Sequence, residues 1–573
     1  MTKKLLQLIP ASFQKKGLVV VVAAFVRAML NFIGLAAMLP VLLLILDANA
    51  ILTNPISAYI YGLGIFPSVR WFVIGVCVAV ILVFLIKNLL NIALLHFQNR
   101  FFIQLFEYFS KQMFVEYYHR GLGFIKQHNS VMLTHQVNQI CSAFVFNVLG
   151  SVSAIISEGI LMLILFVSLL IYNPLVSFML ILVFIPIVLI YILSVRNKLQ
   201  VYGKEENEIR RQQSRMLHET FRGYVEIEIN HAFLSILKRF DKNIQLLKEY
   251  RFKNERISAV PNALIEMGIV VGMILLILMN MTLTGISMQL LFGVFAVAAL
   301  RMLPAVRMIM GRWMQIKYNQ YTLEVIEEGL LQNEKKERKR ESRRLNLTKS
   351  ISVCDLSFAF EDNKDRQILS HLSFTINKGE CVGIKGASGA GKTTLFHLLM
   401  GFYTPDSGSI YVDDIPLTPE NTSCWHNNIA YVSQHVFVMD ASFAHNIAMT
   451  YDNEEPDRGK INNILELLRL KPIIDALPQG MDTRVGEAAN RLSGGEKQRI
   501  GIARALYKDA QVLFFDEATS ALDTETEQEI NQAIKMLSEH NKELTFLIIA
   551  HRESTLSYCD RIINIETLQN ESK

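Results

Sequence analysis

The first half of the chain alternates between long apolar runs and charged stretches. Each apolar run holds the ~20 residues that a helix needs to cross a bilayer. Six such runs within 306 residues argue against the buried helices of a soluble protein. The pattern therefore predicts six membrane-spanning helices, at residues 18–46, 71–95, 143–171, 175–194, 257–283 and 286–306.

Lysine and arginine gather on one side of these spans. They precede the first span at Lys15 and Lys16 and fill the segments after the second and fourth spans, whereas the connections 172–174 and 284–285 carry no charge. Because basic residues favour the cytosolic side of a membrane, both termini are predicted to face the cytosol.

The two charged segments after the second and fourth spans, 102–139 and 197–256, also contain apolar residues at helical spacing. The spans are therefore expected to continue beyond the membrane and to turn at residues 121–129 and 223–232. Each turn is either a docking element for the second half of the chain or a solvated hairpin tip. The pattern alone favours neither.

Composition agrees with a membrane domain joined to a soluble one, since 51% of the 573 residues are hydrophobic and only 19% are charged. The predicted division is a membrane domain at 1–326, a charged linker at 327–344 and a globular domain at 345–573. The net charge of +5 does not call for a nucleic acid. The six cysteines lack paired or metal-ligand spacing and are interpreted as reduced packing residues.

Several charged residues fall inside the predicted spans, where a charge is costly and usually functional. Arg27, Lys87 and Arg301 lie roughly 9–14 Å deep from the cytosolic ends, and Glu158 and Glu266 are their acidic counterparts. Internal pairing of these bases and acids is one interpretation. The surplus of positive charge suggests a second, in which the three bases lie near an anionic group of a substrate, such as a phosphate or pyrophosphate.

The globular half contains a phosphate-binding loop pattern, G-x-x-x-x-G-K-[ST], at residues 386–393. A strand is predicted before it and a helix after it, so that glycine N–H groups and a positive helix end can hold phosphate oxygens. Lys392 is expected to hold the β- and γ-phosphates, and Thr393 to place its hydroxyl on Mg²⁺. The alternative is a glycine-rich turn without a ligand. The expected nucleotide contacts in this segment are Gly386, Ala387, Ser388, Gly389, Ala390, Gly391, Lys392, Thr393 and Thr394.

Residues 512–516 form an apolar strand that ends in Asp516 and is followed by Glu517. In an α/β sheet the carboxyl ends of the strands form the ligand-binding edge, which would place Asp516 beside the phosphate loop. Asp516 is then expected to hold Mg²⁺, through water, and Glu517 to polarise the attacking water.

Residues 492–496, Leu-Ser-Gly-Gly-Glu, open a predicted helix at 497–507. Ser493 and Glu496 can form a capping box, which is the simplest interpretation. Gly494 and Gly495 also expose N–H groups at a positive helix end, which makes a ready anion site. One chain cannot easily bring this helix end to its own phosphate loop. Ser493, Gly494, Gly495 and Glu496 are therefore expected to contact the nucleotide of a second copy.

The order and spacing of these motifs resemble the nucleotide-binding domains of ABC transporters. The matching residues are 386–393, Gln434, 492–498, 512–517, 520–523 and 550–552. With six spans ahead of them, the chain is similar to a half-transporter of the ABC exporter type. The resemblance implies a six-span α-helical membrane domain, an α/β P-loop NTPase domain, ATP hydrolysis coupled to transport, ATP and Mg²⁺ as cofactors, and a homodimer in the plasma (inner) membrane.

The resemblance also implies roles for single residues. Gln434 would couple the γ-phosphate and Mg²⁺ to the membrane helices, and His551 would contact the γ-phosphate. Asp523 would lie at the dimer seam, Phe360 would stack on adenine, and residues 483–487 resemble a loop that touches the partner. The expected catalytic residues are Lys392, Gln434, Glu517 and His551, and the expected metal contacts are Thr393, Gln434 and Asp516.

Within that family, the membrane segments resemble those of bacterial lipid-linked oligosaccharide flippases of the PglK type, at residues 31–40, 255–262 and 300–306. This likeness suggests the export or flipping of a lipid-linked oligosaccharide, a polyprenyl-pyrophosphate glycan, or another anionic lipid from the cytosolic to the outer side. Export of peptides, drug-like compounds or phospholipids is the alternative within transport. An ATP-gated channel or sensor is the alternative outside it.

Overall fold

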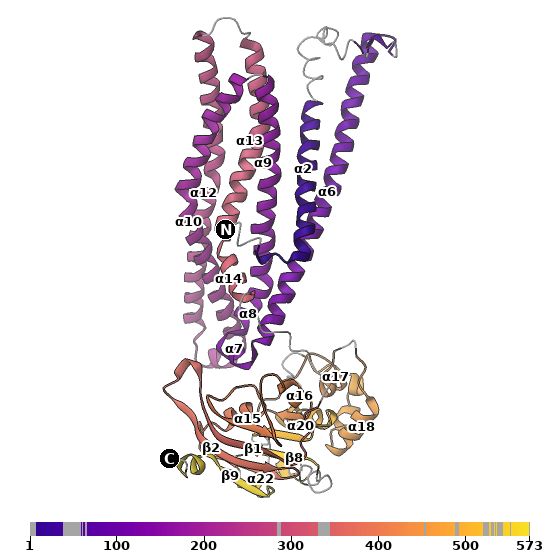
Figure 1. The fold of residues 1–573 in the computed structure, drawn as a ribbon, viewed down its shortest axis with the longest axis vertical. Helices are drawn as coiled ribbons and strands as arrows, with labels where there is room; N and C mark the ends of the chain where they lie inside the picture. The colour runs from indigo at the N-terminus through magenta and orange to yellow at the C-terminus, as the bar shows by residue number, and fades with distance from the viewer. Residues whose placement is uncertain are drawn as a thin grey trace. The chain divides into compact units, whose positions relative to one another are not determined.

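The computed structural model describes residues 7–37, 59, 61–63, 66–172, 174–282, 288–330, 344–451, 454–486, 492–518, 527–528, 532, 535, 543–550 and 552–571. The chain divides into two compact units, Met1–Glu334 and Lys335–Lys573. Long helices make up the first unit, and strands with shorter helices make up the second (Figure 1).

The first unit is a bundle of long helices. They are α2 (Ala11–Ala36), α6 (Val69–His119), α9 (Gly150–Tyr172), α10 (Pro174–Arg222), α12 (Phe233–Thr282) and α13 (Met288–Tyr318). Helix α2 packs against α6 and α9, α9 against α13, and α10 against α12 and α13 (Figure 1).

Within the described part of the chain, five helical segments are long and apolar enough to cross a membrane. They are Ala11–Gly34, Val69–His119, Ser130–Ile171, Ile181–Arg222 and Phe233–Leu275. The sixth predicted span, 286–306, begins among residues 283–287, which lie outside the described residues, and its remainder belongs to α13. Residues 38–46 of the first predicted span also lie outside them.

Three helices far exceed the ~20 residues that a span requires. Helices α6, α10 and α12 contain 51, 49 and 50 residues. The predicted turns at 121–129 and 223–232 are confirmed, because the short helices α7 (Gly121–Gln127) and α11 (Tyr224–Ile229) form there, with α8 (Ser130–His135) after the first. Apolar side chains on α11, such as those of Tyr224 and Ile229, are exposed within this chain.

The helix that follows α8 contains two π-helical segments, η1 (Gln136–Ile140) and η2 (Ala143–Leu149). Each π turn accommodates an extra residue relative to an α-helix. The second segment packs firmly, since Phe144 is fully buried and its ring meets that of Phe109 edge-on at 5.3 Å and 89°. The widened turns are therefore part of a well-packed core.

Helices α10 and α13 approach closely at a glycine. A Cβ atom added to Gly203 would lie 1.8 Å from the backbone oxygen of Tyr318. The hydroxyl of Tyr318 reaches back to the Glu206 carboxylate, one turn along α10. Only a residue without a side chain permits this crossing.

The second unit contains a five-stranded parallel sheet and a four-stranded antiparallel sheet. The parallel order is β6 (Ile429–Val432), β7 (Val512–Asp516), β8 (Thr545–Ile549), β3 (Cys381–Lys385) and β9 (Arg561–Asn564). The antiparallel order is β2 (Gln367–Asn377), β1 (Ser350–Ala359), β4 (Ser407–Val412) and β5 (Ile415–Pro416). Strands β7 and β8 are buried along their whole length, as expected of parallel strands covered on both faces.

Short helices complete this α/β unit. They are α15 (Lys392–Leu399), α16 (Thr422–His426), α17 (Phe443–Ala448), α18 (Arg458–Leu467), α19 (Lys471–Asp475), α20 (Gly494–Tyr507), α22 (Glu553–Leu556) and α23 (Ile565–Glu571). In the first unit, α14 (Tyr321–Leu330) follows α13. All six cysteines are free thiols, as expected.

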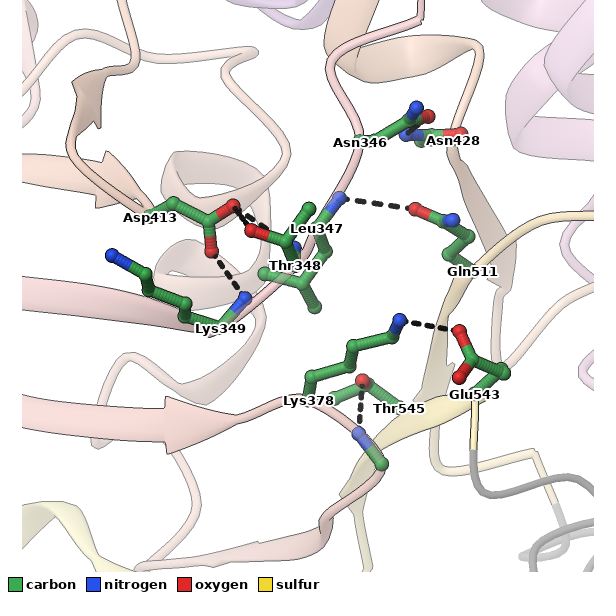
Figure 2. Close-up of polar contacts among 11 residues, drawn as sticks. Asn346, Leu347, Thr348, Lys349, Lys378, Asp413, Asn428, Gln511, Glu543 and Thr545 are labelled. Carbon is green, nitrogen blue, oxygen red and sulfur yellow. Dashed lines mark hydrogen bonds and ion pairs between the residues drawn. The ribbon is translucent and has the colours of Figure 1, made fainter.

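Polar contacts to several segments hold residues 346–349, which lead into strand β1 (Figure 2). The Asp413 carboxylate accepts hydrogen bonds from the backbone N–H groups of Thr348 and Lys349 at 2.9 and 2.7 Å. Gln511, just before β7, accepts one from the Leu347 N–H at 3.0 Å. These bonds fix the position at which the chain enters the sheet.

Candidate functional site

The phosphate-binding loop lies between β3 and α15, in the strand–loop–helix setting that the sequence predicts. Gly391 occupies the N-cap of α15 at φ +89° and Gly389 has φ +86°, a region that side chains disfavour. The Lys392 side chain turns back into the loop, where its ammonium donates to the carbonyl oxygens of Gly386 and Ala387 at 2.9 and 3.0 Å. A buried cation is thus held inside a ring of backbone groups.

Strand β2 supports the end of this loop. A Cβ atom on Gly391 would approach the side chains of Leu369 and Ile368 to 2.8 and 2.9 Å. The loop therefore requires glycine at this position for two reasons, its backbone angle and the close approach of β2.

Asp516 ends the buried strand β7 and lies next to the loop. Its carboxylate accepts hydrogen bonds from the Thr393 hydroxyl at 3.3 Å and from the Tyr431 hydroxyl at 3.1 Å. Burial raises the pKa of Asp516 above its ordinary value, and the charge of Glu517 acts in the same direction, while these two hydrogen bonds oppose them. A buried carboxylate beside a hydroxyl offers the oxygen donors that Mg²⁺ prefers, so the residues fit this ion.

Glu517 has a left-handed backbone, with φ +50°, and its N–H donates to the Ile549 carbonyl at 3.0 Å. Its carboxylate accepts a hydrogen bond from the Gln434 side-chain amide at 2.7 Å. Gln434 follows β6, the strand next to β7. Neighbouring strand ends therefore bring the two residues together, while Gln434 contacts Glu517 rather than Asp516.

Ser493 and Glu496 form the predicted capping box at the start of α20. The Ser493 hydroxyl accepts from the Glu496 N–H at 3.2 Å, and the Glu496 carboxylate accepts from the Ser493 N–H at 2.7 Å. Gly494 and Gly495 form the first turn of the helix. Among the described residues, none of these four residues hydrogen-bonds to the phosphate loop, and their role toward the nucleotide of another copy stays a prediction.

Phe360 belongs to an aromatic cluster at the end of β1. It remains 38% exposed, and its ring meets those of Phe358 and Tyr403 edge-on at 5.2 and 5.7 Å. One face of the Phe360 ring is thus braced while the side chain stays accessible, which suits a stacking role.

Other predicted residues lie partly or wholly outside the described part of the chain. They are His551, the segment 520–523 with Asp523, and Glu487 of the segment 483–487. Arg301 lies in α13, but its side chain also lies outside that part.

The described intramembrane bases do not make the predicted pairs with glutamate. Arg27 of α2 donates to the Gln98 side-chain oxygen at 3.1 Å, so its partner is neutral. Lys87 of α6 passes close to the backbone of α2, 2.7 Å from the position of a Cβ on Gly34, with its ammonium 4.8 Å from the Phe84 ring centre. Within the described part of the chain, neither base forms an ion pair with Glu158 or Glu266.

Sequence reasoning missed three residues at the site. Tyr431 contacts Asp516 from β6, and Tyr403 braces Phe360. Glu566, at the start of α23, accepts a hydrogen bond from the Ala387 N–H of the loop at 3.0 Å. Only Tyr431 carries a signal, since it precedes Gln434 in the same strand-and-loop segment. The other two depend on contacts between distant segments.

Other proteins share the sequence motifs and the fold described above. Residues 369–520 match the family model described as ABC transporter. An ATP-dependent lipid A-core flippase of Burkholderia pseudomallei (strain 1710b) is 29% identical over 462 residues, which cover 79% of this chain and 76% of the flippase. A flippase of the same name from Polaromonas sp. (strain JS666 / ATCC BAA-500) is 43% identical over 216 residues, 38% of this chain and 36% of that protein.

Among solved structures, a bacterial Atm1-family ABC exporter with ATP bound matches with a TM-score of 0.76 at 21% identity, over 95% of this chain and 93% of that one. The chain has the fold of an ABC exporter half-transporter. The predicted fold class is confirmed, and the half-transporter carries an ABC ATPase domain that couples ATP hydrolysis to transport. The Burkholderia and Polaromonas relatives are named lipid A-core flippases, so the narrower likeness to the PglK type stays a prediction.

Proposed function

We propose that the half-transporter acts as a homodimer that uses ATP hydrolysis to move an anionic lipid from the cytosolic to the outer leaflet of the plasma membrane. The similar proteins named above are lipid flippases, which supports a lipid cargo. The main evidence for the proposal is a pocket lined by basic residues in the first unit, Met1–Glu334.

This pocket lies between α12 and α13 and has a volume of about 590 Å³. We propose that it lies at the cytosolic ends of the predicted spans 257–283 and 286–306, near the level of the inner-leaflet headgroups. Its polar lining consists of Asn254, Ser258, Arg307, Arg312, Gln315 and Tyr318, and its apolar lining of Pro304, Met308, Gly311 and Met314. A mixed lining of this kind suits a molecule with a charged head and an apolar body.

The charge of the pocket selects an anion. None of the ten lining residues is acidic. Arg312 donates to the neutral Gln315 side chain at 2.9 Å, and within the described residues Arg307 forms no ion pair. Two guanidinium groups that have no acidic partner among the described residues favour a phosphate, which they can bind through paired N–H donors. A peptide cation or a cationic dye would meet like charge here.

The basic residues inside the predicted spans favour a headgroup that carries more than one anionic group. Arg27 keeps its net charge, because its partner Gln98 is neutral. We propose that Arg27, Lys87 and Arg301 approach further anionic groups of the cargo as it moves through the membrane. A polyprenyl-pyrophosphate glycan carries two adjacent phosphates and remains the finer proposal for the cargo.

The proposed motor is a pair of ATP molecules, each enclosed between the phosphate loop of one copy and the Ser493 helix end of the other. Lys392 and the loop N–H groups hold the phosphates, and Phe360 stacks on adenine. Glu517, oriented by Gln434, takes a proton from the attacking water. Thr393 and Asp516 would hold Mg²⁺, which neutralises phosphate charge when bound.

The cargo proposal is tested with the full chain in discs of neutral phosphatidylcholine. ATPase activity is measured with added phosphatidylglycerol, a polyprenyl pyrophosphate, a hydrophobic peptide or a cationic dye. We expect the two anionic lipids alone to stimulate hydrolysis. The double change Arg307→Gln with Arg312→Gln should reduce the stimulation about tenfold or more, because two charge-assisted contacts are lost.

Arg251→Gln is the matched control. This arginine lies on the same α12 helix, is largely exposed, pairs with Glu255 at 3.8 Å and is not one of the residues that line the pocket. It should leave the stimulation unchanged. The anionic cargo would be refuted if the peptide or the dye stimulated hydrolysis, or if the anionic lipids stimulated the double variant fully. Neither result would contradict the assignment of ATPase activity.

A further inference from the structure

The helix that follows the last strand of the parallel sheet contacts the phosphate loop directly. Helix α23 begins at Ile565, which is fully buried, and the Glu566 N–H donates to the Asn564 side chain at 3.1 Å. This bond orients the first turn of the helix. The Glu566 carboxylate then accepts the hydrogen bond from the Ala387 N–H, the first amide after the leading glycine of the loop.

Two further contacts join α23 to the same loop. A Cβ on Gly386 would lie 3.9 Å from the Ile565 Cβ, so these backbones pack side by side. Gln569, one turn after Ile565, donates to the Ile368 carbonyl at 3.5 Å. The Ile368 carbonyl and side chain in turn cover Gly391 at the far end of the loop. One helix therefore supports the loop at both of its ends.

The carboxylate of Glu566 has two opposite effects on a bound triphosphate. As a hydrogen-bond acceptor it fixes the loop in shape before the nucleotide arrives, which favours binding. As an anion beside a phosphate-binding loop it repels the phosphates. Because Glu566 is exposed, the repulsion is screened and small, whereas the hydrogen bond that orders the loop contributes more, with a neutral acceptor oxygen as well as with a charged one.

We propose that Glu566 is a positioning residue for ATP binding, which orders the phosphate loop through the Ala387 N–H while its charge weakens the affinity for the triphosphate. The residue sets the ATP concentration at which the transporter works, and it does not touch the reacting atoms. The proposal depends on ATP binding alone and is independent of the cargo.

Two substitutions separate the two effects. Glu566→Gln keeps an acceptor oxygen and removes the charge, so both the KM for ATP and the Kd for a fluorescent ATP analogue should fall about 2–5-fold. Glu566→Ala removes both effects, and because the hydrogen bond is the larger one, the same two quantities should rise about 3–10-fold. The kcat should stay near that of the unmodified chain in both variants.

Salt dependence distinguishes the charge effect from a structural one. The difference in Kd between the unmodified chain and Glu566→Gln should shrink at high ionic strength. The higher Kd of Glu566→Ala should persist, because a lost hydrogen bond is not screened by salt. Glu553→Gln is the control, since this exposed acid pairs with Lys385 at the end of β3, at 3.4 Å, and contacts no loop amide. It should change neither quantity.

Two results would overturn the proposal. One is an unchanged KM and Kd in both Glu566 variants. The other is a rise in Kd for Glu566→Gln, since this would mean that charge favours nucleotide binding. Equal thermal unfolding temperatures for the variants and the unmodified chain confirm that the comparison is made on folded protein.

Discussion

Glu517 is held in an unusual backbone conformation at the point where hydrolysis is proposed to occur. A left-handed φ at a non-glycine residue costs free energy and persists where the surroundings impose it. Here the imposing contact is the bond from the Glu517 N–H to Ile549 in the adjacent strand. It turns the side chain to meet Gln434, so that a carboxylate and an amide are oriented together.

Glu517→Gln should separate nucleotide binding from cleavage. The amide cannot accept a proton from water, so we expect kcat for ATP to fall by about 100-fold or more, while ATP still binds through Lys392 and the loop. Single-turnover hydrolysis and binding of a fluorescent ATP analogue measure the two steps. A variant that still cleaves ATP at the normal rate would require a different general base.

Asp413 offers a test of stability at a single residue. Burial alone would raise its pKa, but hydrogen bonds from Thr348, Lys349 and Ser350 outweigh it, and the pKa lies below its ordinary value. The carboxylate therefore stabilises the fold at pH above the ordinary value of 3.8, and this contribution is lost as the pH falls through the lower, folded-state pKa. Figure 2 shows the carboxylate between Thr348 and Lys349.

Asp413→Asn should lower the free energy of unfolding by about 1–2 kcal/mol, because the amide NH₂ group cannot accept the bonds that one oxygen makes. The adjacent Asp414→Asn is the control, since Asp414 is exposed and its ion pair among the described residues is with Lys349, at 3.3 Å. In thermal unfolding near neutral pH, the difference in the free energy of unfolding between the unmodified chain and Asp413→Asn should not change with pH. The difference should narrow only in strong acid. Equal losses from both variants would contradict the assignment.

The residues that sequence reasoning located are those whose position depends on a short stretch of chain. The phosphate loop needs only its own glycines, and Asp516 needs only the strand that precedes it. Tyr403 and Glu566 reach the site through packing between distant segments, for which no local pattern exists. The partner of Arg27 was missed for the same reason, because Gln98 lies 71 positions away.

At the scale of elements, hydrophobic runs located the apolar parts of the helices but not where the helices end. Helices α6, α10 and α12 continue far beyond these runs as amphipathic extensions, which the spacing of apolar residues did predict. Close contacts between helices were not predictable in this way. Gly203 is one glycine among 30 in the sequence, and only the structure shows that α13 lies against it.

Gly203→Ala should separate α10 from α13. The added methyl group would overlap the Tyr318 backbone oxygen, and a backbone atom cannot rotate away as a side chain can. We expect a loss of about 1–3 kcal/mol in the free energy of unfolding, as for an overpacked core. The measurement is thermal unfolding of the full chain in detergent.

Gly159→Ala is the matched change within α9. A Cβ at Gly159 meets nothing within 4 Å, so this change should be neutral or slightly stabilising through helix propensity. If both alanines have the same effect, the close crossing of α10 and α13 contributes nothing specific.

At the scale of the whole molecule, no hydrogen bond joins the Ser493 helix end to the phosphate loop among the described residues, and we predict that the nucleotide sites are shared between two copies. Two mixed dimers test this. The first joins a Lys392→Ala chain to a Ser493→Arg chain, and the second joins a chain that carries both changes to an unmodified one.

If each nucleotide site is built from two chains, the first dimer has one intact site and the second dimer has none. We therefore expect ATPase activity, up to about half the normal rate for one of two sites, in the first dimer alone. Sites built within one chain would give the reverse pattern. The measurement uses differently tagged chains and two successive affinity steps, so that only mixed dimers are assayed.

The π-helical segments η1 and η2 change how the helix from Ser130 to Tyr172 can be compared or engineered. Each residue of an α-helix turns the chain by about 100°, so an extra residue in a widened turn rotates everything beyond it to a new face. A helical wheel drawn through the full length would assign lipid-facing and buried positions wrongly on one side of these turns. Any chimaera that exchanges this helix must preserve the number of residues between His135 and Gly150, because a single deletion would present the wrong face to the bundle.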